Sequence, residues 1–214
     1  MKRLKDEFLN KLEAFTPLTN LAVLEIGCGI GGRSVDIADR CDQLSALEPD
    51  PKLLAKAKEL NARSNISYLL GSAEVLPFED QTFEIIIFTL SLHHVPINKM
   101  ATAIGEAVRV TKKDGFVVFL EPQHSGSFFE AELLFDACDG DERKEKARAY
   151  FEMLAFRNYR EVAEIEDETI FSFESAEDFT QNLNPKKNLS QLVDFLETHQ
   201  FILNAKRRIN TFQV

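Results

Sequence analysis

The sequence predicts an α/β fold in which a mostly parallel, doubly wound sheet carries helices on both faces. Two observations lead to this prediction. From Leu21 onward, short apolar runs alternate with amphipathic segments, as they do in repeated βα units. A chain of 214 residues with 44% hydrophobic residues is also long enough for one domain with a sizeable core, but short for two.

The sheet is expected to have seven strands. Each expected strand is a short apolar run bounded by turn residues, which is typical of strands buried in a sheet. The runs cover residues 21–26, 43–48, 66–71, 83–90, 115–121 and 168–173, with a last strand within residues 201–213.

Helices are expected before the first strand and between the others. Residues 1–16 carry apolar side chains at helical spacing, so they predict an N-terminal helix. Asp50 is the expected N-cap of the next clear helix, and Pro51 its first residue. Pro96 is expected to open another helix that runs to about Thr111.

Residues 125–160 depart from this rhythm. They look largely helical and carry more aromatic and aliphatic side chains than a connecting helix needs. Either they form a cap over a pocket, or they pack into the core as a crossover helix pair. The expected organisation is a single domain with the N-terminal helix, a core of residues 20–122, this helical cap or insertion after the fifth strand, and C-terminal strands and helices over residues 161–214, including a helix over 189–199.

The charge balance argues against a nucleic-acid partner. The formal net charge is −10, which repels a phosphate backbone unless basic groups gather on one face. Only two basic clusters stand out, Lys186–Lys187 and Lys206–Arg207–Arg208. Both are expected to be solvated, although the second could contact an anionic substrate.

Membrane insertion and disulfide bonds are not expected either. No segment approaches the roughly 18 apolar residues that cross a bilayer. The start of the chain mixes charges into its apolar stripe, unlike an export signal, so a cytoplasmic location is expected. Cys28, Cys41 and Cys138 lack paired spacing and are expected to be reduced thiols.

The stretch VLEIGCGIGGRSVDIA, residues 23–38, places a glycine-rich loop between the first strand and a helix. Four glycines within six residues remove the Cβ atoms that would keep a ligand away from the backbone N–H groups. A tight turn without chemical use explains one glycine but not four. The loop therefore predicts a ligand lying against the main chain.

Two ligands fit the glycine pattern. Gly27, Gly29 and Gly32 match the dinucleotide pattern G-x-G-x-x-G, with Glu48 about 20 residues further on for a ribose. The loop also matches acid-x-Gly-x-Gly-x-Gly, beginning at Glu25. A carboxylate there is unfavourable beside a pyrophosphate, but it can bind the ammonium group of an amino-acid ligand, directly or through water. S-adenosylmethionine carries such an ammonium group, a ribose and an adenine.

Over roughly residues 20–122 the sequence resembles the class I S-adenosylmethionine-dependent methyltransferases, most closely the branch of small-molecule and quinone-biosynthesis methyltransferases. The resemblance rests on four stretches in the family's order: VLEIGCGIG, ALEPDPKLL, GSAEVLPFEDQTFEIIIFTLSLHHV and RVTKKDGFVVFLEP. It implies a Rossmann-like cofactor-binding core, S-adenosylmethionine as methyl donor and S-adenosylhomocysteine as product.

The resemblance also implies a set of cofactor-binding residues. In that reading Glu25 lies near the amino group and Glu48 binds both ribose hydroxyls. Ser72 flanks the adenine, where the family often has Asp, while Thr89 and Leu90 face the sulfonium. The full set is Glu25, Gly27, Cys28, Gly29, Glu48, Pro49, Ser72, Ala73, Thr89 and Leu90.

Methyl transfer requires no particular side chain, but an amine or a neutral alcohol as acceptor would need a base. The candidates follow the fourth and fifth strands, because open α/β sheets bind ligands at the carboxyl ends of their strands. His93 and His94 follow the fourth strand, and adjacent residues point apart, so at most one faces a pocket. His93 is the candidate base; otherwise it is a hydrogen-bonded loop histidine. No metal site is expected, since no further histidine or paired carboxylate stands at ligand spacing.

These observations predict an enzyme that moves a methyl group to a small, partly apolar metabolite by in-line displacement, a transferase of class EC 2.1.1. The alternative is a non-catalytic sensor or scaffold that only binds S-adenosylmethionine or S-adenosylhomocysteine. A nicotinamide dehydrogenase is disfavoured by Glu25 and by the segment LPFEDQTF. The acceptor, the atom methylated and the oligomeric state are left open by the sequence.

Overall fold

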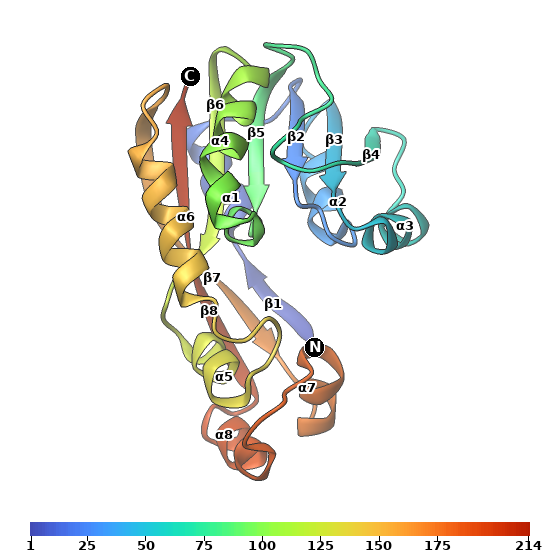
Figure 1. The fold of residues 1–214 in the computed structure, drawn as a ribbon. Coiled ribbons are helices and arrows are strands. Elements are labelled where there is room, and N and C mark those ends of the chain that lie inside the picture. Colours follow the sequence, from blue (N-terminus) through green and yellow to red (C-terminus); the bar gives the residue numbers. More distant parts are fainter.

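The computed structural model describes residues 1–214 and contains one mixed sheet of eight strands in the order β1-β7-β8-β6-β5-β2-β3-β4. The α/β class and the mostly parallel centre are as predicted (Figure 1). The strands are β1 (Lys2–Asp6), β2 (Ala22–Ile26), β3 (Gln43–Glu48), β4 (Ile66–Leu70), β5 (Phe83–Thr89), β6 (Thr111–Pro122), β7 (Arg160–Ser172) and β8 (Ile202–Gln213).

Eight α-helices accompany the sheet. One of them, α3, begins as the sequence predicts, because the Asp50 side chain accepts hydrogen bonds from the first turn and Pro51 follows it. The helix expected from Pro96 starts later, at Met100, after a short 3-10 turn over Ile97–Lys99. The helices are α1 (Phe8–Phe15), α2 (Gly32–Ala38), α3 (Pro51–Leu60), α4 (Met100–Val110), α5 (Ser127–Phe135), α6 (Arg143–Ala155), α7 (Ala176–Leu183) and α8 (Leu192–Thr198).

Hydrophobic side chains alternate between the two faces of the parallel strands, so each face has its own core. Ile86 and Phe88 of β5 pack on one face under α4 and α6, where Met153 is fully buried. Ile85 and Ile87 pack on the other face under α1 and α2 (Figure 1). The period of two along β5 is what gives the sheet two apolar faces, and helices cover both.

The prediction of seven strands is wrong by one, because residues 2–6 form an edge strand instead of the start of a helix. β1 pairs antiparallel with β7, and nearly all of its residues are exposed. Charged residues are usual on such an edge, since they discourage further strand pairing. Helical spacing of the apolar residues persists only from Phe8, where α1 begins.

The last two strands form a long antiparallel pair, which answers a question that the sequence leaves open. β7 is 13 residues long, far more than the predicted 168–173, and α7 and α8 lie between it and β8. The pair extends past the parallel strands and ends among α5, α7 and α8 (Figure 1). There a separate core forms, centred on Phe135, Phe179 and Leu196.

The predicted helical segment 125–160 splits between two environments. α5 belongs with α7 and α8 to the separate core around Phe135. α6 instead packs against α4 and the sheet through Ala149 and Met153. The loop between these helices lies beside the carboxyl end of β5 and contributes to the site described below. The two helices therefore have different surroundings, and a cap over a pocket stays a prediction.

The sequence predicts that the basic cluster 206–208 is solvated, but the structure buries part of it in ion pairs. Arg207 is only 2% exposed and forms ion pairs with Asp167 of β7 and Asp6 of β1. Lys206 pairs with Glu168 at 2.6 Å on the neighbouring strand position. Because β7 and β8 pair over their whole length, acidic residues 166–168 stand opposite these three basic ones.

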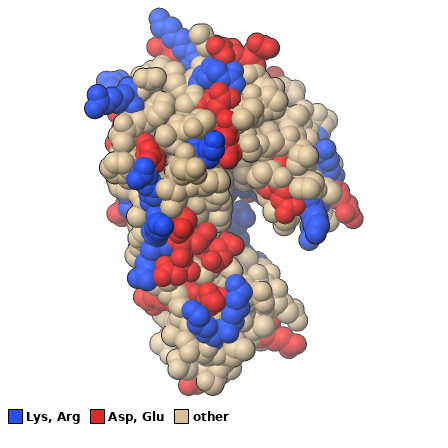
Figure 2. All heavy atoms as spheres, in the orientation of Figure 1, with Lys and Arg blue, Asp and Glu red and all other residues tan.

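Figure 2 shows charges of both signs on one face of the molecule. A notch separates the parallel strands from the lower part of the molecule, which consists of α5, α7, α8 and the adjoining ends of β7 and β8. On that face no continuous basic surface is visible. None of the helices combines the length and apolar character that crossing a bilayer requires.

Candidate functional site

The glycine loop between β2 and α2 adopts a backbone that side chains disfavour. The φ angles of Gly27, Gly29 and Gly31 are +79°, +57° and +79°, whereas Gly32 does not have a positive φ. The three left-handed glycines are those of the acid-x-Gly-x-Gly-x-Gly pattern, and the third glycine of the dinucleotide pattern is an ordinary helical residue. The geometry therefore favours the acid-x-Gly-x-Gly-x-Gly pattern over the dinucleotide pattern.

Glu25 lies directly behind this loop. Its carboxylate is fully buried and accepts hydrogen bonds from the hydroxyls of Ser34 (2.5 Å) and Thr89 (2.9 Å). Burial raises the pKa of Glu25 although these hydrogen bonds act in the opposite direction. The Thr89 oxygen is also 3.2 Å from the carbonyl oxygen of Gly27. Glu25 thus connects β2, α2 and β5 beneath the loop.

A cavity of about 550 Å³ opens in front of the loop, at the carboxyl ends of the parallel strands. We call it the glycine-loop cavity. It brings together seven of the ten residues that the sequence assigns to cofactor binding: Gly27, Gly29, Glu48, Pro49, Ser72, Ala73 and Leu90. The other three, Glu25, Cys28 and Thr89, do not line it. Cys28 is buried, which raises the pKa of its thiol to about 12.

Glu48 stands at the wall of this cavity, at the end of β3. One carboxylate oxygen accepts the N–H of Gly29 at 2.8 Å, and the other accepts the N–H of Asp50 at 3.0 Å. Each carboxylate oxygen has two lone pairs, so both can accept a further hydrogen bond from a ligand. The two backbone contacts fix the direction in which Glu48 faces.

Ser91 is an important wall residue that the sequence analysis does not identify. Its hydroxyl donates to the carbonyl of Ile26 at 2.6 Å, and this contact presses the side chain against the loop. A Cβ on Gly27 would stand 2.3 Å from the Cβ of Ser91. Contacts between neighbouring strands decide this position, and no spacing in the sequence reveals it. Further wall residues outside the predicted set are Ile26, Leu47, Leu53, Gly71, Glu74, His94, Val95, Pro96 and Asp139.

A second cavity of about 220 Å³ adjoins the first; we call it the arginine cavity, after Arg33 and Arg207 in its wall. It is lined from the core by His93 and from the lower part of the molecule by side chains such as Phe128. Leu90, His94 and Asp139 line both cavities. The expectation that at most one of His93 and His94 faces a pocket is therefore wrong, since both line the arginine cavity and their ring centroids are 4.1 Å apart. Two ligands bound in the two cavities would therefore meet at a shared wall.

Leu90 occupies an unusual backbone conformation in that shared wall. Its φ is +57°, a region that side chains other than Gly, Asn and Asp seldom adopt and that costs about 1–3 kcal/mol. Its N–H donates to the carbonyl of Leu120 at 2.8 Å, which holds the strand end in place. Strain of this kind at the junction of two cavities is typical of a functional site.

His93 is the buried histidine at the carboxyl end of β5. Its Nδ1 is 2.5 Å from Glu121 Oε2, and the other oxygen of Glu121 accepts the N–H groups of Ser91 and Leu92. Burial alone would lower the pKa of His93, but the charge and hydrogen bond of Glu121 outweigh it and raise the pKa. A carboxylate at Nδ1 leaves Nε2 as the atom that can accept a proton.

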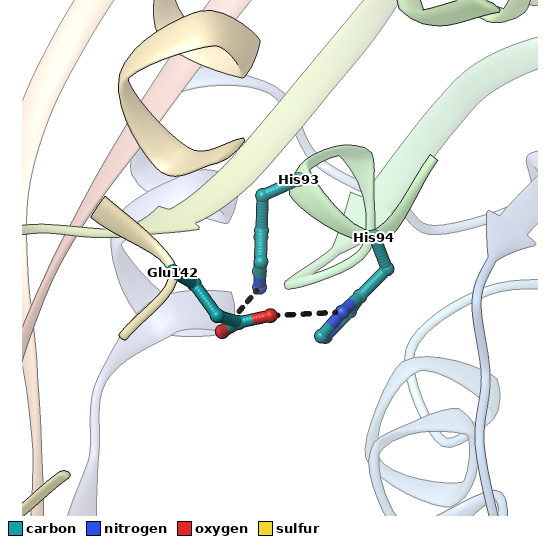
Figure 3. A group of neighbouring side chains, drawn as sticks. All are labelled: His93, His94 and Glu142. Carbon is teal, nitrogen blue, oxygen red and sulfur yellow. Dashed lines mark ion pairs between the residues drawn. The ribbon is translucent and has the colours of Figure 1, made fainter. Parts of the chain in front are cut away.

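Glu142, from the loop before α6, points its carboxylate toward both His93 and His94 (Figure 3). Its carboxylate oxygens are 3.9 Å from His93 Nε2 and 3.3 Å from His94 Nδ1, and the three ligand atoms lie within 4.8 Å of one another. The sequence predicts no metal site because it shows no carboxylate at ligand spacing from the histidines. The fold brings the carboxylate of Glu142 next to them. The Nζ of Lys146, 3% exposed, is 3.4 Å from Glu142 and already provides a positive charge there.

A family model described as a methyltransferase domain matches residues 24–119. The malonyl-[acyl-carrier protein] O-methyltransferase of Buchnera aphidicola is 36% identical over 122 residues, 57% of this chain and 46% of that protein. The ubiquinone/menaquinone biosynthesis C-methyltransferase of Rickettsia prowazekii is 34% identical over 128 residues, 55% of this chain and 49% of that protein. The chain spans about half the length of these curated relatives.

Solved structures share the whole fold at low sequence identity. A crystal structure from Bacillus halodurans superposes with a TM-score of 0.68 at 19% identity, covering 96% of this chain and 97% of the other. A SAM-dependent methyltransferase from Aquifex aeolicus gives 0.57 at 12% identity, covering 95% and 89%. These similarities extend over the lower part of the molecule, which the family model does not reach.

Proposed function

Because the chain belongs to the class I S-adenosylmethionine-dependent methyltransferases, in the quinone-biosynthesis-like branch, we propose that it transfers a methyl group from S-adenosylmethionine to a small, partly apolar metabolite. The observation that carries the proposal is the glycine-loop cavity, where a bare main chain and the Glu48 carboxylate face the same space. The formal charge of −10 supports a small acceptor over a nucleic acid.

The residues present fit S-adenosylmethionine. Gly27 and Gly29 leave the main chain open to a ligand, and Glu48 offers two oxygens to a pair of ribose hydroxyls. Ser72 and Ala73 stand in the same wall for the adenine. When bound, the cofactor supplies an electrophilic methyl group on a sulfonium. Glu25 does not line the cavity, so we assign it the role of holding the loop through Thr89 and Ser34.

The acceptor is proposed to occupy the arginine cavity. Its wall shares Leu90 with the glycine-loop cavity, so an acceptor atom there can approach the methyl group in line. Methyl transfer from a sulfonium depends mainly on positioning and on excluding water. His93, buried and paired with Glu121, is proposed as the base that takes a proton from a neutral acceptor.

We propose that the chain divides these tasks along its sequence. Residues 20–122 form the cofactor-binding core. Residues 125–160 supply acceptor contacts through Phe128, Phe129 and Glu142, which line the arginine cavity. Residues 161–214 close that cavity from the other side through Thr169, Phe171 and the basic strand β8. The N-terminal region contributes Asp6, which holds Arg33 and Arg207.

Thermal unfolding with two ligands tests the donor. S-adenosylhomocysteine is expected to raise the melting temperature and NAD to leave it unchanged, since only a ligand of the native state stabilises it by mass action. In Glu48→Gln the affinity for S-adenosylhomocysteine is expected to fall about 30-fold, because a charged bidentate contact worth about 2 kcal/mol is lost. Isothermal titration calorimetry measures this change. Glu59→Gln, an exposed substitution on α3, serves as the control.

Turnover separates the enzyme from the alternative, a sensor that only binds the cofactor. Incubation with methyl-labelled S-adenosylmethionine and a metabolite extract is expected to give a labelled small molecule. Binding of S-adenosylhomocysteine without any transfer of label would favour the sensor. Equal affinity of wild type and Glu48→Gln for S-adenosylhomocysteine would remove the basis of the donor assignment.

A further inference from the structure

We propose that the methyl acceptor is a small carboxylic acid whose carboxylate binds Arg33 in the arginine cavity, while its methyl-accepting atom lies toward Leu90 and His93. The proposal rests on the proposed function, because it names the chemical class of the acceptor. It depends on the free donors of Arg33 at the cavity wall, on the sharing of its one carboxylate partner and on the apolar remainder of the cavity.

Arg33 is a buried guanidinium with few partners. It lies in the first turn of α2, its side chain is 12% exposed, and its one ion pair joins Nη1 to Asp6 Oδ2 at 2.9 Å. The face of its guanidinium packs over the ring of Phe8. A guanidinium has five N–H donors in a planar fork that matches a carboxylate. A buried cation that keeps donors free at a cavity wall is suited to an anionic ligand.

The carboxylate that pairs with Arg33 is shared with other cations. Asp6 also lies 3.5 Å from Arg3 and 2.8 Å from Arg207. Arg3 is 38% exposed and has a second partner in Asp36, whereas Arg207 is buried and pairs with Asp167 as well. Arg33 therefore has only a share of one carboxylate, and the carboxylate of an acidic ligand can be its second partner.

None of the acidic residues that line the cavity forms an ion pair with Arg33. Glu132 and Glu142 both lie 3.4 Å from the buried Nζ of Lys146 and are occupied by it. Asp139 is the third carboxylate in the wall and belongs to the loop shared with the glycine-loop cavity. The cations of the wall nearest the strands β7 and β8 are Arg33, Arg207 and Lys206, and Lys206 pairs with Glu168.

The remaining wall selects the body of the acid. Phe128, Phe129, Phe171 and Leu90 supply apolar surface, and the volume of about 220 Å³ admits a molecule of about one ring. His93 lines the same cavity, so an acid anchored at Arg33 can present a second group to it. The acceptor is therefore expected to combine one carboxylate, a short apolar body and a methyl-accepting hydroxyl or amine.

A matched pair of probes tests the carboxylate. Phenylacetate and phenylacetamide have the same shape and differ in charge, and their affinities are measured by ligand-observed NMR with S-adenosylhomocysteine present. Wild type is expected to bind the acid at least 10-fold more tightly than the amide. Arg33→Gln is expected to remove this preference while leaving the amide unchanged. Arg63→Gln, whose side chain contacts only the carbonyl of Ala62, is the control.

The outcomes distinguish this inference from the proposed function. Arg33→Gln leaves Asp6 paired with Arg3 and Arg207, and circular dichroism checks that it folds. If the variant does not fold, the comparison of the two probes on wild type still decides. Equal binding of acid and amide, or an unchanged preference in Arg33→Gln, overturns the carboxylate site while binding of S-adenosylhomocysteine keeps the methyltransferase assignment. Absence of that binding affects the proposed function alone, since both probes are also titrated without it.

Discussion

Gly27→Ala is expected to abolish detectable binding of S-adenosylhomocysteine, a loss of at least about 100-fold, and to destabilise the fold by about 2–4 kcal/mol. Two costs combine at this position. The backbone φ of +79° is unfavourable for alanine, and the new Cβ would stand 2.3 Å from the Cβ of Ser91. Relief requires either the loop or Ser91 to move into the glycine-loop cavity. Calorimetric titration and chemical denaturation measure the two effects.

Two other glycines of the loop give matched controls for Gly27→Ala. Gly32 has ordinary helical geometry and open space around its Cβ position, so Gly32→Ala is expected to preserve binding and to gain up to about 1 kcal/mol from helix propensity. Gly29 has a φ of +57° but no neighbour within 4 Å, so Gly29→Ala is expected to be intermediate in stability. An order of effects other than Gly27, Gly29, Gly32 would contradict this account of the loop.

His93→Gln is expected to lower kcat about 100-fold or more without changing the affinity for S-adenosylhomocysteine, because His93 does not line the glycine-loop cavity. A base must be unprotonated to act, and the Glu121 carboxylate raises the pKa of His93 against the effect of burial. The pH profile of kcat/KM in wild type is therefore expected to rise with pH, with its midpoint above 6.5. In Glu121→Gln the charge is lost and the midpoint is expected to shift to lower pH.

The control for these variants is His199→Gln, since His199 packs against Phe195 in the lower part of the molecule, remote from both cavities in the fold. Its pH profile is expected to match that of wild type. If His93→Gln retains full kcat, the acceptor reaches the site already ionised and His93 has only a structural role. If the midpoint is the same in wild type and Glu121→Gln, the titrating group is not His93.

The parallel part of the fold is predictable because its signals are local. Apolar runs of strand length, the N-cap Asp50 and the glycine loop each depend on neighbours within a few residues, and all three appear where the sequence predicts them. The placement of Glu48 opposite the loop follows from the adjacency of β2 and β3. Seven of the 17 residues that line the glycine-loop cavity are therefore readable from the sequence.

The features that the sequence does not reveal depend on distant partners. Residues 2–6 become a strand because the edge of β7 lies beside them, and the paired residues, from Lys2 with Ser172 to Asp6 with Thr169, are far apart in the sequence. Arg207 is buried because Asp6 and Asp167 come from two other strands, and Glu142 reaches His93 only after α5 turns the chain. Charge spacing along one segment carries no information about such pairs.

The long β7–β8 pair has a consequence for how this protein can diversify. The far end of this pair packs with α5, α7 and α8 in a separate core, away from the strands that surround the glycine loop. Substitutions in α5, α7 and α8 can change the arginine cavity, where the acceptor is proposed to bind, without changing the glycine-loop cavity. The family model accordingly matches residues 24–119 and does not reach α5, α7 and α8.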